Sequence, residues 1–429
     1  METDTGRDMY RWASDLFPIA RSLTGPGVRE TLSYLGGLMP GLTVHSIASG
    51  TKVLDWIVPD EWTLRSAYLE DEKGRRIIDV ANNNLHVVGY SEPVDAWLSL
   101  DELQPNLHSL PAQPTAIPYI TSYYQRRWGF CLSHAQRQTL QPGRYHAVID
   151  SSLEPGVLNW AELILPGQTE QEVLLSTYIC HPSMANNEMS GPVLVTALAR
   201  WLAALPQRRL TYRILFHPET IGALVQLSRN LEALREKTIA GFVATCCGDD
   251  AAFTFMPSRL GGTLADRVAT HVLTRHAPGY ATASFLHRGS DERQYCSPGV
   301  DLPVVSIMRS MYGRYPQYHT SLDDLSFISP DGLAGSFAIM RRCIGILEAN
   351  VTFRTTVLGE PQLGRRGLYP TLSTKESAAT VHDILNVLAY ADGQHDLIAL
   401  AERIGLDALA CEAIARKLVD AGVMEILRD

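Results

Sequence analysis

The chain has 429 residues, of which 45% are hydrophobic, and a formal net charge of −9. This length and hydrophobic content allow one large buried core or two to three smaller ones. The negative charge gives no electrostatic reason to expect nucleic acid or an anionic membrane as the main partner. Seven scattered cysteines, an odd number, are typical of a reducing compartment.

The N-terminal segment METDTGRDMYRWASDLFPIARSL predicts an amphipathic helix, and a Gly-Pro-Gly break precedes a second helical pattern. The first segment lacks the basic start and the continuous apolar run of a signal peptide. No apolar window approaches the ~20 residues that a membrane span requires. We therefore expect a cytoplasmic protein without a membrane partner.

Between about residues 44 and 150 the chain alternates apolar and polar residues. The run KVLDWIVPDEWTLRSAYLEDEKGRRIIDV shows this period-two pattern, which is typical of half-buried strands. Turn residues interrupt the pattern at Pro59-Asp60 and at Lys73-Gly74. The segment therefore predicts an all-β domain.

From about residue 158 apolar strand patterns alternate with helical patterns of about 15 residues. EVLLSTYIC precedes the helical GPVLVTALARWLAAL, and LTYRILFHP precedes the helical ALVQLSRNLEALREK. Two further apolar runs, IAGFVATCC and VDLPVVSIMRS, follow in the same zone. Such alternation predicts an α/β sandwich with helices on both faces of the sheet.

The last block, residues 375–429, has the pattern of three short helices and a terminal strand, as in a winged helix-turn-helix. DNA binding would require basic residues on its second or third helix. The block contains ten acidic and five basic residues, a net charge of −5, so phosphates would repel it. We expect no nucleic-acid partner; a protein partner or a second copy of the chain fits this domain better.

Polar residues gather where the predicted strands end. They are His181, Glu219 and Asp249 after three strands, and Asp291, Arg293, Tyr318 and His319 in later loops. Reactive groups collect at the carboxyl ends of strands in doubly wound sheets. A zinc hydrolase needs about three N or O ligands, an open position for water and a carboxylate base.

Each of these residues also has a structural interpretation. His181 could be a core histidine at a strand end, and Glu219 could be an acid favoured by a helix N-terminus. Asp249 could cap a turn. The order of the motifs, rather than any single residue, indicates a hydrolase site.

That order resembles the zinc exopeptidase superfamily of aminopeptidases, through YICHPSMANNEMSGP, LFHPETIGAL, DERQYCSPG and YHTSLDDL. More closely, the chain is similar to bacterial aminopeptidase-like proteins, through NNLHVVGYS, AIPYITSYYQRRWGFCLS and EPQLGRRGLYP. The resemblance covers nearly the whole chain. It implies an α/β fold, a three-layer αβα exopeptidase-like sandwich with a mixed sheet, at residues 1–48 and 115–370. It also implies an inserted jelly-roll-like β domain at 49–114 and a winged helix-turn-helix-like domain at 375–429.

The resemblance assigns roles residue by residue. The two metal-binding histidines of the superfamily match His181 and His319. The place of the metal-bridging aspartate, counted without gaps from Ser-Gly, falls on Asn186, with Asn187 next to it. Two successive glutamates, base and then ligand, match Glu219 and Thr220. A neutral amide cannot supply the charge that holds two cations together, so a complete two-metal site is not expected.

The resemblance therefore implies one divalent ion, Zn²⁺, as the cofactor. Its ligands would be His181, His319 and one carboxylate, with Glu188 as the first choice and Asp249 as the second. Such a set suits zinc and leaves a position for water. Asp291 could also be a ligand, or could orient one.

The expected activity is hydrolysis of the amide bond of a small peptide, an aminoacyl amide or an amino-acid conjugate. Glu219 would be the general base acting on a metal-activated water. Asp291, Arg293 and Tyr318 are the candidates for binding the substrate. Two alternatives stay open: acyl transfer or cyclisation at one metal, as in glutaminyl cyclases, and a catalytically degenerate protein that binds a peptide or serves as a scaffold.

Overall fold

The computed structural model describes residues 2–368 and 375–427. The chain divides into two compact units: Met1–Ala265 with Tyr280–Ala338, and Asp266–Gly279 with Ile339–Asp429. None of the described helices combines the length and the apolar character that crossing a membrane would take.

The first unit contains an eight-stranded mixed sheet. In spatial order its strands are β1 (Thr43–Ala48), β10 (Val157–Leu165), β12 (Thr211–His217), β11 (Glu172–Tyr178), β13 (Thr238–Val243), β16 (Val304–Met308), β14 (Thr254–Met256) and β15 (Ala281–Thr282). The four central strands, β12, β11, β13 and β16, are parallel, whereas β1, β10 and β14 each pair antiparallel with a neighbour. Every residue of β11 is buried, which explains the apolar run at residues 173–175.

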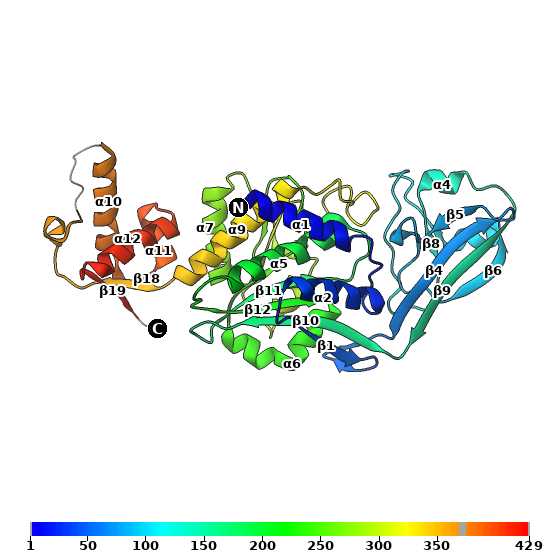
Figure 1. Cartoon of the computed structure of the whole chain (residues 1–429), viewed down its shortest axis with the longest axis horizontal. Helices are drawn as coiled ribbons and strands as arrows, with labels where there is room; N and C mark the ends of the chain where they lie inside the picture. The colour runs from blue at the N-terminus through cyan, green and yellow to red at the C-terminus, as the bar shows by residue number, and fades with distance from the viewer. Residues whose placement is uncertain (1, 369–374, 428–429) are drawn as a thin grey trace. The chain divides into compact units, whose positions relative to one another are not determined.

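Helices cover both faces of this sheet (Figure 1). On one face α5 (Ser190–Ala203) packs against β11 and contacts α1 (Glu2–Leu16) and α2 (Pro26–Leu38). On the other face α6 (Ile221–Lys237) and α8 (Glu292–Tyr295) share a core with β11, β12, β13 and β16. The close approach of α5 to β13 requires Gly191, because a Cβ there would lie 2.3 Å from the carbonyl oxygen of Ala244. The predicted three-layer α/β sandwich with a mixed sheet is confirmed.

A second sheet lies in the same unit, with antiparallel strands in the order β5 (Arg76–Asp79), β4 (Glu61–Asp71), β9 (Arg144–Glu154) and β6 (Val94–Ser99). Short pieces accompany it: the hairpin β2 (Lys52–Val53) and β3 (Trp56–Ile57), the pair β7 (Leu107–His108) and β8 (Phe130–Cys131), and the helices α3 (Leu100–Leu103) and α4 (His134–Gln138). Strand β9 pairs with both β4 and β6, so this β region extends past the expected boundary at residue 114. Its description as a jelly roll stays a prediction.

The second unit contains most of α7 (Leu264–His276) and the second half of α9 (Pro330–Ala349). The remaining helices are α10 (Lys375–Tyr390), α11 (Leu397–Ile404) and α12 (Ala408–Asp420), and the strands are β17 (Thr352–Thr355), β18 (Asp392–Asp396) and β19 (Met424–Leu427). Strand β17 is the centre of a three-stranded sheet. The winged-helix arrangement therefore begins near residue 352 rather than at the expected 375, because its central strand precedes its helices.

Candidate active site

The candidate site lies at the carboxyl ends of the central parallel strands. His181 comes three residues after β11, and Glu219 comes two residues after β12. Because β11 and β12 are parallel neighbours, their carboxyl ends meet at one edge of the sheet. This edge brings together most of the residues that were predicted from the sequence.

His181 lies between two carboxylates. Its Nδ1 is 2.7 Å from Oε2 of Glu188, and its Nε2 is 3.5 Å from Oε2 of Glu219. The Glu188 side chain is fully buried, whereas 19% of the Glu219 side chain is exposed. Burial, with Arg21 nearby, lowers the pKa of His181 to about 3, so the ring is neutral at pH 7. A neutral ring that donates Nδ1–H to Glu188 turns the lone pair of Nε2 toward Glu219.

Beside Glu188 lies the buried guanidinium of Arg21. Its Nε is 3.9 Å from Oε1 of Glu188 and donates to the carbonyl oxygen of His181 at 3.1 Å. Burial lowers the pKa of Arg21 to about 10, which leaves it charged at pH 7. Burial raises the pKa of Glu188, and the charge of Arg21 opposes that rise. Arg21 was not predicted: it lies 160 positions from His181, and no local motif marks it.

A strained turn fixes Glu219. Thr220 has φ 64° and ψ −72°, and the N–H of Ile221 donates to the carbonyl of Glu219 at 2.7 Å, which makes a γ-turn. A β-branched residue in this conformation costs about 1–3 kcal/mol. Asp291 Oδ1 accepts the N–H of Thr220 at 2.7 Å, and Arg293 donates to the Thr220 hydroxyl. Asp291 and Arg293 therefore support the turn that carries the candidate base.

The surroundings of Glu219 also affect its basicity. Burial and, next, the carboxylate of Asp291 raise the pKa of Glu219 well above its ordinary value, while Arg293 opposes the rise. A carboxylate with a raised pKa is a better proton acceptor than a solvated one. The environment is thus favourable for a general base.

Other strained residues lie at the same edge. Ser183, Cys246 and His319 have φ of 40°, 52° and 54°, which non-glycine residues rarely adopt. Ser183 and Cys246 follow the ends of β11 and β13, and His319 lies in the loop after β16. Such strain tends to persist where the surrounding structure enforces a functional geometry.

His319 reaches the site through a pairing of two loops. The N–H of Tyr119 donates to the carbonyl oxygen of His319 at 2.9 Å. The Tyr119 ring lies 5.2 Å from the ring of His181 and 5.1 Å from that of His319, centroid to centroid. The two imidazoles are 5.5 Å apart, and Tyr318 stacks on His319 at 3.8 Å. The structure thus brings the predicted His319 and Tyr318 to His181, together with Tyr119, which was not singled out.

These residues surround a pocket of about 330 Å³. It is lined by Leu23, Trp56, Tyr119, Thr121, Tyr123, Tyr124, Cys180, His181, Glu219, Thr220, Ile221, Arg293 and His319. The aromatic members come from the β2–β3 hairpin and from the segment after β7. The polar members, apart from Thr121, come from α8 and from loops that follow strands of the large sheet. Four of the predicted site residues therefore line one cavity.

Asp249, expected as the second choice of metal ligand, is held elsewhere. Its Oδ2 accepts from Nδ2 of Asn186 at 2.7 Å and from the N–H of Ser310 at 3.0 Å. Oδ1 of Asn186 accepts from the N–H groups of Gly248 and Asp249. An asparagine can donate and accept at once, so Asn186 joins two loops where a metal-bridging acid was sought. Asp249 is not among the described residues that line the pocket.

One group of potential metal ligands is found among the described residues: Cys180, His181 and Glu188, with donor atoms within 4.8 Å of one another. Oε1 of Glu188 is buried and accepts no hydrogen bond there. Thiolate, imidazole and carboxylate donors suit zinc. These three residues fit one ion. Cys180 was not predicted, although it adjoins His181.

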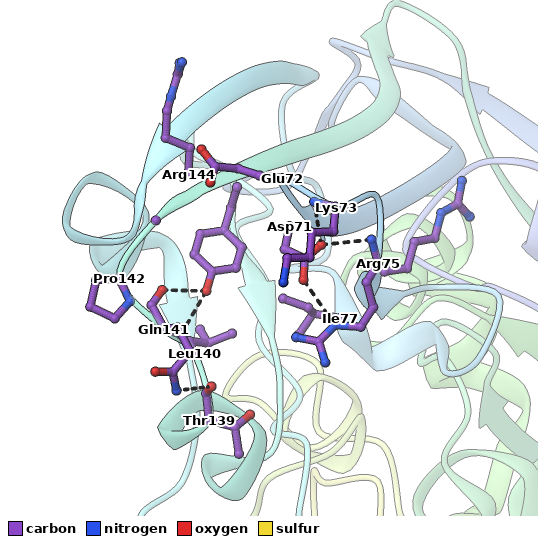
Figure 2. A pocket seen from close by; sticks show the side chains of 13 residues that line it. Asp71, Glu72, Lys73, Arg75, Ile77, Thr139, Leu140, Gln141, Pro142 and Arg144 are labelled. Atoms are coloured by element: carbon purple, nitrogen blue, oxygen red, sulfur yellow. Dashed lines mark hydrogen bonds and ion pairs between the residues drawn. The ribbon is translucent and has the colours of Figure 1, made fainter.

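A second pocket, of about 390 Å³, lies at the β4–β5 turn (Figure 2). Its charged residues are mostly engaged in local structure: Oδ1 of Asp71 accepts the N–H groups of Lys73 and Arg75, both at 3.0 Å. No histidine or cysteine is among its described lining residues. The candidate site residues predicted from the sequence therefore gather at the pocket beside His181 and not at this one.

The large sheet and its helices have the α/β fold of zinc aminopeptidases. A zinc aminopeptidase from Bacillus subtilis is similar to this chain with a TM-score of 0.57 at 12% identity, over 80% of this chain and 95% of that one. At this identity the likeness shows the fold alone.

The chain belongs to a family described as "Domain of unknown function (DUF4910)", whose model matches residues 10–350, and a winged helix-turn-helix model matches residues 351–426. A Clostridium acetobutylicum protein named "Putative polysaccharide biosynthesis protein with aminopeptidase-like domain" is 42% identical over 407 residues, 94% of this chain and 93% of that protein. A crystal structure of a "putative peptidase" from the same species has a TM-score of 0.94 at 40% identity, over 99% of this chain and 97% of that one. The expected aminopeptidase-like fold and winged helix are confirmed.

Proposed function

We propose that the pocket hydrolyses an amide bond of a small peptide or amino-acid conjugate, with Glu219 as general base. The observation that carries this proposal is the placement of His181 between the buried Glu188 and the partly exposed Glu219, at an aromatic pocket. The names of the relatives, with their aminopeptidase-like domain and peptidase descriptions, support the same reaction class.

Glu219 takes a proton from the attacking water and delivers it to the leaving amine. The γ-turn at Thr220 holds the position of this carboxylate, because Asp291 and Arg293 bind the N–H and the hydroxyl of Thr220. Oε2 of Glu188 lies 2.7 Å from Nδ1 of His181, so the two side chains are positioned together. The aromatic walls exclude bulk water and position the substrate.

Cys180, His181 and Glu188 are the residues that would hold a divalent ion, and zinc suits their donor atoms. Such an ion supplies a Lewis acid that polarises the scissile carbonyl and lowers the pKa of water. Removal of metal with a chelator should abolish hydrolysis, and about one equivalent of Zn²⁺ should restore it. Restoration that requires two equivalents would contradict the single-ion site.

The reaction itself can be tested in ¹⁸O-labelled water. Zinc-loaded protein is incubated with a panel of dipeptides and N-acyl amino acids, and the products are analysed by mass spectrometry. Hydrolysis places one ¹⁸O atom in the released carboxylate. A cyclised or acyl-transferred product without ¹⁸O would show that the reaction is cyclisation or acyl transfer rather than hydrolysis. If all the substrates stay unchanged, the result favours a protein that binds without catalysis.

A further inference from the structure

The pocket contains one positive and one negative side chain. Among the described lining residues, Glu219 is the one carboxylate and Arg293 the one side chain that stays cationic at every physiological pH. If Glu219 serves as the base, the charge left to recognise a substrate is positive.

Three neighbouring carboxylates are buried beside the pocket, each with one oxygen in contact with a partner and one without a hydrogen-bond partner. Glu188 contacts His181, Asp291 accepts the N–H of Thr220, and Glu292 accepts from the Tyr312 hydroxyl. All three are fully buried, and none lines the pocket. A substrate ammonium group would therefore find no carboxylate other than the base.

Arg293, by contrast, has capacity to bind an anion. One of its terminal nitrogens donates to the Thr220 hydroxyl, while its Nε is buried without a hydrogen-bond partner. A buried donor without a partner is costly. Because Arg293 lines the pocket, its remaining terminal N–H groups can bind a carboxylate there.

The position of Arg293 indicates where that carboxylate lies in the substrate. Arg293 binds Thr220, the residue directly after Glu219. Arg293 is thereby held close to the base that would protonate the leaving nitrogen. In an amino acid the α-carboxylate is one carbon away from that nitrogen.

We propose that the substrate is an N-acyl amino acid whose free α-carboxylate binds Arg293, rather than a peptide recognised by a free amino terminus. The substrate class rests on the proposed hydrolysis. In the reaction water adds across the amide: the C–N bond breaks, hydroxide joins the acyl carbon, and the nitrogen receives the proton held by Glu219. The products are the carboxylate of the acyl group and a free amino acid.

The rest of the pocket fits an apolar or aromatic acyl amino acid. Trp56 and Tyr124, on its wall, expose 40% and 54% of their surfaces and contact each other with ring centroids 5.7 Å apart. Aromatic rings pack favourably in such offset or edge-to-face arrangements. An aromatic carboxylate can therefore serve as a probe of the pocket.

The first experiment measures binding and does not depend on turnover. Titration calorimetry of the zinc-loaded protein at pH 7 compares 3-phenylpropionate with 3-phenylpropylamine, two probes that differ in the sign of their charge. We expect the carboxylate to bind at least about tenfold more tightly. Arg293→Gln should remove this preference, Arg293→Lys should keep part of it, and Arg65→Gln, which changes an exposed arginine paired with Asp150, should leave it unchanged. Equal or tighter binding of the amine to the wild type would overturn the proposal.

The second experiment compares hydrolysis of N-acetylphenylalanine with that of phenylalaninamide. We expect the acylated acid to be cleaved with the higher kcat/KM, and Arg293→Gln to raise its KM more than it lowers kcat. Faster cleavage of phenylalaninamide would overturn the proposal and leave hydrolysis standing. If neither compound is cleaved but the carboxylate still binds through Arg293, anion recognition stands and the proposed hydrolysis falls.

Discussion

At the scale of single residues, the electrostatics of His181 depend on a buried pair. Glu188 contacts Nδ1 of His181, and Arg21 lies 3.9 Å from the other oxygen of Glu188. Both side chains of the pair are fully buried. A buried carboxylate is costly without an opposite charge, and the charge of Arg21 opposes the rise that burial causes in the pKa of Glu188.

Arg21→Met should lower the free energy of unfolding of the first unit by about 3–5 kcal/mol, because it leaves a buried carboxylate without its cation. All seven tryptophans lie in this unit, so their fluorescence during guanidinium denaturation follows its unfolding. The double variant with Arg21→Met and Glu188→Gln should recover part of the lost free energy of unfolding.

The control for Arg21→Met is Arg11→Met, which changes an exposed arginine of α1 paired with Asp8 and should leave the unfolding free energy unchanged within error. A loss below about 1 kcal/mol for Arg21→Met would contradict the role of the pair.

At the scale of elements, the β2–β3 hairpin contributes to the pocket of a different sheet. Leu54, between the two strands, has φ 55° and allows a tight turn before Trp56. The hydroxyl of Tyr124 donates to the carbonyl of Ile57 at 3.2 Å, which ties the hairpin to the second aromatic wall. The hairpin is therefore placed to select the apolar part of a substrate.

Trp56→Ala should raise the KM for an aromatic substrate about tenfold, since it removes a large apolar contact, and should leave kcat nearly unchanged. Steady-state kinetics on N-acetylphenylalanine provides the measurement. Trp97→Ala is the matched control, because Trp97 is similarly exposed, at 42%, but stacks on His146 in the four-stranded sheet. Equal effects of the two substitutions would rule out the hairpin as a selective wall.

At the scale of the whole molecule, both the full chain and its C-terminal block have a negative net charge. The chain has a net charge of −9, and residues 375–429 account for −5 of it. A winged helix places a helix in a DNA groove only where basic side chains contact the DNA phosphates. We therefore propose that this domain contacts protein.

The full-length protein should not retard duplex DNA in an electrophoretic mobility assay, even at 50 mM salt, where electrostatic binding is strongest. A band shift that weakens as salt is raised would contradict this expectation. Size-exclusion chromatography with light scattering shows in the same sample whether the chain associates with itself.

The α/β sandwich and the strand-end positions of His181 and Glu219 could be predicted, because strand and helix periodicity and polar strand ends are local signals. Arg21 and Tyr119 could not be predicted, because their contacts join segments far apart in the chain. Whether Asn186 or Glu188 occupies the place of the metal-bridging acid was decided in the sequence by counting residues without gaps from Ser-Gly. The π-helix Ala185–Met189 changes which side chain faces His181, since such a turn adds a residue to the helical repeat.

The most direct test of the account is the kcat/KM of Glu219→Gln for amide hydrolysis by zinc-loaded protein. The substitution keeps the shape of the side chain and removes its ability to accept a proton, so we predict a fall of about 10²- to 10⁴-fold. Binding of 3-phenylpropionate and the melting temperature should be retained, and Glu232→Gln on the exposed surface of α6 should have full activity. Retention of the wild-type rate by Glu219→Gln would contradict the assignment of this pocket as a hydrolytic site with Glu219 as its base.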